Sequence, residues 1–306
     1  MSSKENQMQQ TTFTFESASG AFPVPWSTGY QTYSGFLSTI DGISDSDVAT
    51  KIHESDFSGL SNSGLIGNQW GHADRDYHHS ICPAGEATYE LKLGIIHPED
   101  RAIYEALIKA FVIEDRNLPL AHGELSAIEV STDRVSHTEL LEQSAAIAES
   151  ATGVRMRFVS PTCRQRYGDV WEATPHRVSL FSHLLDRWTL SAPEDSGFEL
   201  SIDPQTIGES IYPQVDPDTY QTNTMVVYRA EPSVDAADSN ESESVASDGG
   251  RRQAQGYMGD WEFRFKDASE STRTAILTLA QFAEFAGIGH FTARGGGAVE
   301  TEVLGV

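Results

Sequence analysis

The chain has 306 residues, 39% of them hydrophobic and 9% aromatic, which is enough for one large domain or two ordinary ones with proper cores. Its 45 acidic residues against 21 basic ones give a formal net charge of −24. This composition is typical of a globular rather than a disordered chain. The acids are spread over the whole length, which favours adaptation to high salt, where ions screen self-repulsion, over the alternative of one basic partner.

Neither a disulfide framework nor a membrane anchor is expected. Cys82 and Cys163 are too few for such a framework and lack zinc-type spacing. The N-terminus is polar, without the apolar core of a signal peptide. No apolar run approaches the roughly 20 residues that a bilayer-spanning helix needs. We therefore expect a cytoplasmic protein with no membrane partner.

The first half of the chain predicts strands and helices in a definite order. Residues 1–10 are polar and are expected to be disordered, and the alternation of Phe13 and Phe15 with polar residues predicts a strand. A helix is predicted from about residue 28 and a short one over 44–55, followed by loops or short hairpins to residue 86. A strand over 87–96, a helix over 97–111 and a strand over 124–131 complete the order of a ferredoxin-like βαββαβ unit.

The second half repeats this order without a convincing sequence repeat. Its predicted strands cover 154–160, 222–230, 260–267 and 298–304, and its helices 176–188 and 271–286. We expect an α+β fold of tandem ferredoxin-like (RRM-like) domains over 11–150 and 151–306. Residues 231–250 hold six acids and no basic residue, so a disordered acidic insertion is predicted over 231–255.

The stretch GIGHFTARGGG, residues 287–297, contains five glycines and lies between the last helix and the last strand. Gly287 is explained as a helix C-cap. The phosphate-binding fingerprints of mononucleotide sites place their glycines between a strand and a helix, which is the opposite order. The stretch instead predicts a surface where the backbone approaches a polyanion closely, with Arg294 inside it. The predicted contacts are Gly287, Gly289, Arg294, Gly295 and Gly297.

Residues 155–187 form a basic island. They hold six arginines against three acids, a net +3, while the other residues carry 15 basic and 42 acidic groups, a net −27. Either the arginines bind RNA phosphates, or they pair with carboxylates on a solvated sheet face. The candidates for RNA contact are Arg155, Arg157, Arg164, Arg166 and Arg177.

A loop rich in histidine offers His72, His78, His79 and Cys82, which together suggest a metal site. Their spacing matches no standard pattern of paired ligands, and histidine-rich surface loops are common. We therefore expect no metal and no cofactor. A metal-dependent hydrolase that uses this loop stays as an alternative.

Several segments together resemble one family. The glycine spacing of residues 287–297 matches its signature, and FPVPWSTGYQTYSGFLSTI with SDVATKIHE resembles its N-terminal block, a helix pair that ends in a histidine. RMRFVSPTCRQ and VSLFSHLLDRW resemble the start of its second domain and the helix after it. The chain thus resembles the CRISPR repeat-RNA processing endoribonucleases of the repeat-associated mysterious protein superfamily, over residues 11–306 apart from the acidic insertion.

The resemblance implies metal-independent cleavage of precursor CRISPR RNA within each repeat, to make mature guide RNAs. The 2′-hydroxyl would attack the adjacent phosphate and leave 2′,3′-cyclic phosphate and 5′-hydroxyl ends. His53 matches the family's catalytic histidine. Ser38 stands where some members have a tyrosine, and a hydrogen bond from it would orient the 2′-hydroxyl. The implied partners are repeat RNA, other subunits of a type I effector complex and a second copy in a homodimer. A non-catalytic RNA-binding subunit of such a complex is the main alternative.

Overall fold

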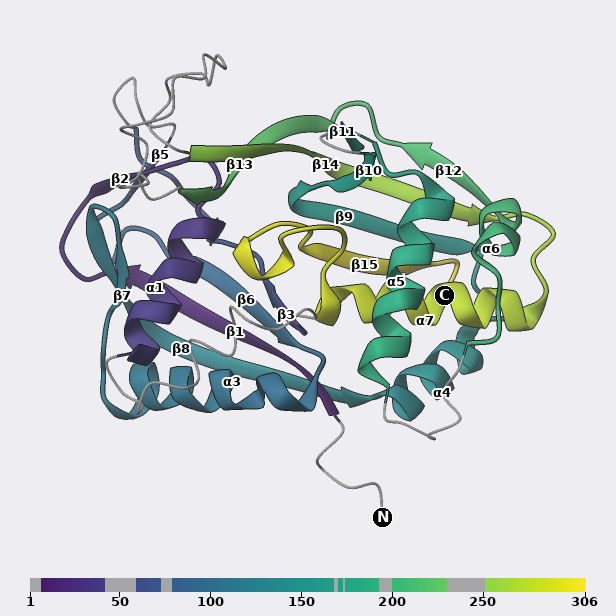
Figure 1. Cartoon of the computed structure of the whole chain (residues 1–306), viewed down its shortest axis with the longest axis horizontal. Helices are drawn as coiled ribbons and strands as arrows, with labels where there is room; N and C mark the ends of the chain where they lie inside the picture. The colour runs from purple at the N-terminus through teal and green to yellow at the C-terminus, as the bar shows by residue number, and fades with distance from the viewer. Residues whose placement is uncertain are drawn as a thin grey trace, which may run out of the picture.

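Two antiparallel sheets with helices packed on them make up the structure (Figure 1). The computed structural model describes residues 7–41, 59–72, 79–167, 170–172, 174–192, 200–229 and 251–306. The predicted short helix over 44–55 and the acidic residues 231–250 lie outside these ranges, and so does His53.

The first sheet lies in the N-terminal half, with strand order β3-β6-β1-β8-β7, and β4 pairs with β6. The strands are β1 (Gln7–Ser17), β3 (Leu60–Asn62), β4 (Ile66–Gly67), β6 (Tyr89–Ile95), β7 (Leu118–Leu120) and β8 (Gly123–Ser136). Alternate residues of β1 face the core, as the sequence predicted, and Phe13 and Phe15 are fully buried.

Helices α1 (Gly29–Asp41) and α3 (Arg101–Ile108) belong to this half. The short helix η2 (Pro98–Asp100) precedes α3, and the π-helical turn η3 (Lys109–Ile113) extends it. Phe36 of α1 and Phe111 of η3 lie in one core with Phe13 and Phe15. Phe111 meets both strand phenylalanines edge-on, at centroid distances of 5.6 and 5.8 Å.

The second sheet has the order β12-β14-β9-β15, and β13 pairs with β14. Its strands are β9 (Gly153–Thr162), β12 (Ile211–Val215), β13 (Gln221–Arg229), β14 (Arg251–Phe265) and β15 (Val299–Leu304). The helices of this half are α5 (Arg177–Ser191), α6 (Pro204–Ser210) and α7 (Glu270–Ala286). Trp188 and Phe282 of these helices pack on the inward side chains of β9.

In each sheet, the first strand of that half lies between two later strands. These are β6 and β8, which precede and follow α3 in the chain, and β14 and β15, which precede and follow α7, so the orders are β6-β1-β8 and β14-β9-β15. This is the order of a βαββαβ unit, so the expectation of two ferredoxin-like units is confirmed. The glycine-rich stretch follows α7 and includes the short helix η4 (Thr292–Arg294).

Smaller elements complete the fold. Helix α4 (His137–Ile147) joins the two halves and packs on α7, and its start is fixed by a capping box between Ser136 and Glu139. Two-stranded ribbons are formed by β2 (Phe22–Val24) with β5 (His79–Ile81), and by β10 (Arg164–Tyr167) with β11 (Val170–Glu172).

Two ordered regions are longer than the composition indicated. Strand β1 starts at Gln7, inside the segment expected to be disordered, because Gln7 pairs with Ser136 of β8. Strand β14 starts at Arg251, inside the expected insertion, because Arg251 pairs with Arg229 of β13. Pairing with a partner strand orders polar residues that have no apolar pattern of their own.

Candidate functional site

The glycine-rich stretch, residues 287–297, is a fixed loop held by its own hydrogen bonds and by the end of β9. Gly287 caps α7 with its N–H donating to the Ala283 carbonyl at 2.8 Å and φ at 69°, which confirms the cap assignment. Within the loop, the Ile288 N–H donates to the Gly297 carbonyl at 2.8 Å. The His290 N–H donates to the Cys163 carbonyl at 2.9 Å.

The glycines are required by contacts within the protein. A Cβ on Gly289 would lie 2.3 Å from the Cys163 carbonyl oxygen, and one on Gly297 would lie 1.8 Å from the Ile288 carbonyl oxygen. Both residues have positive φ, 85° and 73°. The sequence correctly indicated close backbone approach, but the surface that these two glycines approach is the protein's own backbone.

The loop also docks on the N-terminal half at the start of α1. Gly29 and Gly295 meet so closely that a Cβ on Gly295 would lie 2.2 Å from the Gly29 Cα. The Thr292 hydroxyl donates to the Leu60 carbonyl at 3.1 Å, and the Asn62 amide donates to the Ala293 carbonyl at 3.3 Å. The loop is therefore a junction between the two ferredoxin-like units.

Asn62 organises this junction and had no signal in the sequence. Besides Ala293, its amide nitrogen donates to the Gly29 carbonyl at 3.2 Å and its oxygen accepts from the Gly64 N–H at 2.8 Å. The side chain is 1% exposed. A buried amide with partners from three segments fixes their relative positions, because each lost bond leaves a buried polar group unsatisfied. Only the fold brings these partners to Asn62.

Arg294 lies over the first turns of α1. Its guanidinium carbon is 5.8 Å from the centroid of the Tyr33 ring, and a side-chain hydrogen bond joins the two residues. Burial raises the pKa of the Tyr33 hydroxyl, and the positive charge of Arg294 opposes that rise. Tyr33 is therefore a neutral hydroxyl at physiological pH that positions a cation, and it is not suited to take up a proton.

Ser38 is exposed on α1, five residues beyond Tyr33. At about 100° per residue, this spacing turns Ser38 about 140° around the helix axis from Tyr33. Ser38 and Arg294 therefore lie on different sides of α1. The structure does not bring these two predicted site residues together, and it says nothing of His53.

A small pocket lies behind the loop, between the end of β9 and α5. It has a volume of about 230 Å³, part of which is open to solvent, below the ~300 Å³ at which ligand pockets commonly begin. Arg164, Glu172, His183 and Gly289 are among its lining residues. The pocket is therefore too small for a nucleotide cofactor.

Arg164 is held in this pocket by hydrogen bonds to α5. Its Nη1 donates to the Ser179 hydroxyl at 2.8 Å and to the Ser179 carbonyl, and that hydroxyl donates to the Glu172 carboxylate at 2.9 Å. Burial lowers the pKa of His183 to about 3, and burial followed by the charge of Arg164 lowers the pKa of His290. Both histidines are therefore neutral at physiological pH, and the positive charge next to the loop belongs to Arg164 and Arg294.

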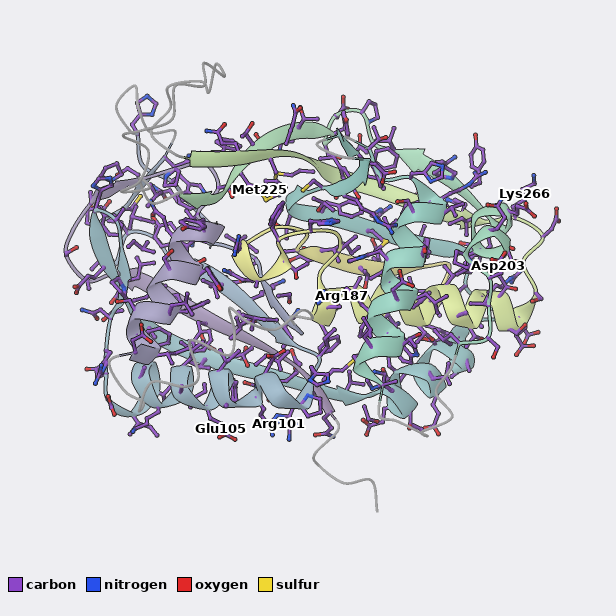
Figure 2. All side chains as sticks on the ribbon, viewed as in Figure 1. Arg101, Glu105, Arg187, Asp203, Met225 and Lys266 are labelled. Carbon is purple, nitrogen blue, oxygen red and sulfur yellow. The ribbon has the colours of Figure 1, made fainter. Side chains whose placement is uncertain are left out.

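The other predicted arginines are distributed over several places. Arg177 begins α5 and donates to the Ile211 carbonyl at 3.4 Å, and Arg166 lies on β10. Arg187, also counted in the basic island, is 7% exposed and donates to the Ala286 carbonyl at 2.9 Å. Burial lowers the pKa of Arg187 to about 10, and Asp100 opposes this shift. Figure 2 shows Arg187 beside the end of α7. There it binds the last carbonyl of α7, next to the glycine-rich loop, and is buried rather than available at the surface.

Arg155 and Arg157 project from the face of β9 that points away from the helices. Arg155 pairs with Glu262 at 2.6 Å and with Glu302, and Arg157 pairs with Asp260 at 2.9 Å. The carboxylates come from the neighbouring strands β14 and β15. This arrangement corresponds to the second interpretation of the basic island, a sheet face of paired charges. Arg155 and Arg157 thus lie on the outer face of the sheet with carboxylate partners, whereas Arg164 and Arg294 lie at the glycine-rich loop.

The histidine-rich loop is only partly described. His72 is exposed, Cys82 is buried, His79 lies between the rings of Trp26 and Trp70, and His78 falls outside the described residues. Within the described ranges, no three His, Cys, Asp or Glu side chains cluster in a way that would hold a metal ion. Over the same ranges, no helix is long and apolar enough to cross a membrane.

Comparison with known proteins gives a sequence match in the second half and structural matches over the whole chain. Residues 156–299 match the family of the CRISPR-associated endoribonuclease Cas6. No protein with a curated description is significantly similar in sequence.

Solved structures match nearly end to end. Thermus thermophilus Cas6 is 16% identical, with 97% of this chain and 98% of that chain covered and a TM-score of 0.61. A Cas6 product complex is 17% identical over 97% of this chain and 100% of that chain, with a TM-score of 0.60. A Cas6-related protein from Pyrococcus furiosus is 12% identical over 96% and 98%, with a TM-score of 0.58. At these identities the structural matches establish the fold. The family match covers residues 156–299 and includes the glycine-rich loop, so the second half of the chain is similar in sequence to the CRISPR-associated endoribonuclease Cas6 family, in agreement with the resemblance noted from the sequence.

Proposed function

We propose that the protein cleaves precursor CRISPR RNA within its repeats and that the RNA backbone passes the junction between the glycine-rich loop and α1. The observation that supports this most directly is the docking of the loop on α1, which holds Arg294 beside Tyr33 at the molecular surface. A fixed guanidinium is suited to a phosphate because its planar donors need little further ordering. Arg164 and Arg177 add positive charge on the α5 side of the loop.

The proposed reaction needs no metal. A base removes the proton of the 2′-hydroxyl, whose oxygen attacks the adjacent phosphorus, and the bond from phosphorus to the 5′ oxygen breaks. An acid protonates the departing 5′ oxygen, which leaves a 2′,3′-cyclic phosphate on one fragment and a 5′-hydroxyl on the other. Charge that develops on the phosphate oxygens is stabilised by positive groups in fixed positions.

His53 is proposed as the acid, because it matches the catalytic histidine of the family and because histidine titrates near neutral pH. Ser38 is proposed to hydrogen-bond the 2′-hydroxyl. Because Ser38 and Arg294 lie on different sides of α1, we propose that Arg294 holds a phosphate that flanks the scissile one whenever Ser38 acts at the reaction centre.

The RNA contacts are proposed to be unequal. Arg294, Arg164 and Arg177, with Arg166 of β10, are assigned to the RNA path. The loop glycines 287, 289, 295 and 297 are assigned the indirect role of holding the loop that carries Arg294, because they pack against atoms of the protein itself. Arg155 and Arg157 contribute less, because a phosphate would first have to displace their carboxylate partners.

The test is incubation of the purified protein with repeat RNA at high salt in EDTA, followed by analysis of the product ends. We expect cyclic phosphate and 5′-hydroxyl ends from the wild type and from Ser38→Ala at reduced rate, and no product from His53→Ala. A repeat RNA with a 2′-deoxy sugar at the scissile position is the control and should bind without being cut. Repeat RNA that is bound but left intact by the wild type would support the non-catalytic RNA-binding subunit instead, and cleavage that EDTA abolishes would support a metal-dependent hydrolase.

Association with other subunits of a type I effector complex, and with a second copy of the chain, completes the proposal. Co-purification with the effector subunits and light scattering at high salt test the two associations separately.

A further inference from the structure

Arg164 differs from Arg155 and Arg157 in the kind of partner that holds it. Arg155 and Arg157 pair directly with carboxylates of the adjacent strands. The hydrogen bonds that the structure describes for Arg164 go instead to neutral oxygens, the hydroxyl and the carbonyl of Ser179 on α5. Arg164 is therefore held in place by partners that do not neutralise its charge.

A carboxylate is nevertheless close to Arg164. In the β10–β11 ribbon Arg164 stands directly opposite Glu172, a position in which opposite charges attract each other across the strands. Here the Ser179 hydroxyl lies between the two side chains. It accepts from Arg164 Nη1 at 2.8 Å and donates to the Glu172 carboxylate at 2.9 Å. Ser179 thus joins the two charged groups and keeps them one hydroxyl apart.

The bonds to Ser179 leave one edge of the guanidinium unused. Both come from Nη1, and no described residue accepts a hydrogen bond from Nε or Nη2 of Arg164. These two nitrogens form a planar fork that matches two oxygens of a phosphate. The residue before Arg164 is tied to the glycine-rich loop, because the Cys163 carbonyl accepts the His290 N–H at 2.9 Å. The unused edge therefore belongs to a cation fixed beside the loop.

We propose that Ser179 is a positioning residue for RNA binding: its hydroxyl keeps Arg164 from pairing with Glu172 and so leaves the Nε–Nη2 edge to an RNA phosphate beside the glycine-rich loop. This inference rests on the proposed RNA function, in which Arg164 is assigned to the RNA path. Without the hydroxyl, the two cross-strand charges would form a direct ion pair like those of Arg155 and Arg157. A phosphate would then have to displace a carboxylate before it could bind.

The test compares RNA affinity and its salt dependence across variants of these three residues. The probe is repeat RNA with a 2′-deoxy sugar at the scissile position, and Kd is measured over a range of salt concentrations. The variants are Ser179→Ala, Ser179→Thr, Glu172→Gln, Arg164→Ala, Ser179→Ala/Glu172→Gln and Ser179→Ala/Arg164→Ala. Thr189→Ala is the control, because it removes an exposed hydroxyl from the other end of the same helix. Ser179→Ala keeps the N-cap of α5, since the bond to His176 comes from the Ser179 N–H.

We expect Ser179→Ala to bind the RNA roughly 10- to 150-fold more weakly, the fold-change equivalent to one hydrogen bond to a charged group. The slope of log Kd against log salt concentration should fall by about 1, as it should in Arg164→Ala. Adding Arg164→Ala to Ser179→Ala should change neither value further, because the same phosphate contact is already lost. Ser179→Thr, which keeps the hydroxyl, should bind like the wild type, and so should Thr189→Ala.

The double variant Ser179→Ala/Glu172→Gln distinguishes positioning from a merely structural role. A neutral amide forms a weaker hydrogen bond with a guanidinium than a carboxylate does, so most of the affinity and of the salt slope should return. Glu172→Gln alone should bind at least as tightly as the wild type. A hydroxyl that served only the packing of α5 would give no recovery, because both variants lack it.

Two results would overturn the proposal: wild-type affinity and slope in Ser179→Ala, or a double variant Ser179→Ala/Glu172→Gln that binds as weakly as Ser179→Ala. Thermal unfolding shows whether Ser179→Ala is destabilised, and in that case the loss of binding in Ser179→Ala relative to Ser179→Thr and the double variant remains decisive. If the wild type neither binds nor cleaves repeat RNA, the proposed function fails. If it does both and the Ser179 variants behave like wild type, only the positioning role fails.

Discussion

Replacing Gly295 with alanine should separate the loop from α1. The new Cβ would lie 2.2 Å from the Gly29 Cα, a distance that no relaxed structure allows. The residue also has φ at 89°, where an L-residue is strained. Both effects act at the junction that holds Arg294, so the substitution is expected to affect RNA binding and stability together.

The magnitude follows from two contributions. Holding alanine at positive φ costs ~1–2 kcal/mol, and forcing an extra methyl group into a packed site costs ~1–3 kcal/mol. We therefore expect Gly295→Ala to lower the free energy of unfolding by ~2–5 kcal/mol, unless the loop moves away and converts part of that cost into lost contacts.

Two other glycines separate the contributions. Gly85 has φ at 78° and no atom within 4 Å of the place that a methyl group would take, so Gly85→Ala carries only the backbone cost. Gly29 lies in α1, and a Cβ on it would lie 2.3 Å from the Gly295 Cα. Gly29→Ala therefore carries only the steric cost. The double variant Gly29→Ala/Gly295→Ala should cost less than the sum of its parts, because the first methyl group already displaces the loop.

Urea unfolding gives the free energies, and binding to non-cleavable repeat RNA gives the functional effect. Gly29→Ala and Gly295→Ala should both weaken RNA binding, and Gly85→Ala should leave it unchanged. If Gly295→Ala loses no more stability than Gly85→Ala, or if the two junction variants are strictly additive, then the loop does not touch α1 and the junction does not exist.

Charge and pH give the remaining predictions. Arg294→Ala should weaken RNA binding and reduce the slope of log Kd against log salt concentration by about 1. Asp260 already neutralises Arg157, so Arg157→Ala should change this slope little and the free energy of unfolding by only ~0–1 kcal/mol. Equal slopes for the two variants would contradict this difference. His137 is 2% exposed, its Nε2 lies 2.9 Å from the Ser191 hydroxyl, and burial lowers its pKa from 6.5 to about 4. Between pH 6.5 and 4 the unfolded chain therefore binds more protons at His137 than the folded protein does. The stability contributed by neutral His137 is thus complete above pH 6.5 and is lost as the pH falls, by about 2 kcal/mol at pH 5. His137→Gln should show a correspondingly smaller loss between about pH 7 and pH 5 in urea unfolding, and an unchanged loss would show that His137 is not the group responsible.

The local patterns of the sequence predicted most of the elements because each element buries one face. Alternation marked β1, β6 and β9, and helical spacing marked α1, α5 and α7, so the order of two ferredoxin-like units could be read before any contact was known. The boundaries at Gln7 and Arg251 could not, because those polar residues are ordered by the strands opposite them.

For the site, glycine content located the loop but not the surface that it approaches. A glycine indicates that a side chain would not fit at its position, but it does not indicate which atoms occupy the space that a Cβ would need. Only the fold shows Cys163 and Ile288 there. In the same way, the charge count located the basic island, but pairing across β9, β14 and β15 decided that Arg155 and Arg157 face carboxylates.

Residues that are neighbours along the chain were enough to predict the two βαββαβ units, the glycine-rich loop between the last helix and the last strand, and the resemblance to the family. Contacts between distant segments could not be predicted in this way. The docking of Gly295 on Gly29, the partners of Asn62 and the packing of His79 against Trp26 and Trp70 join segments from 9 to more than 200 residues apart. Such contacts depend on the packing of one unit or sheet edge against another, which no local pattern encodes.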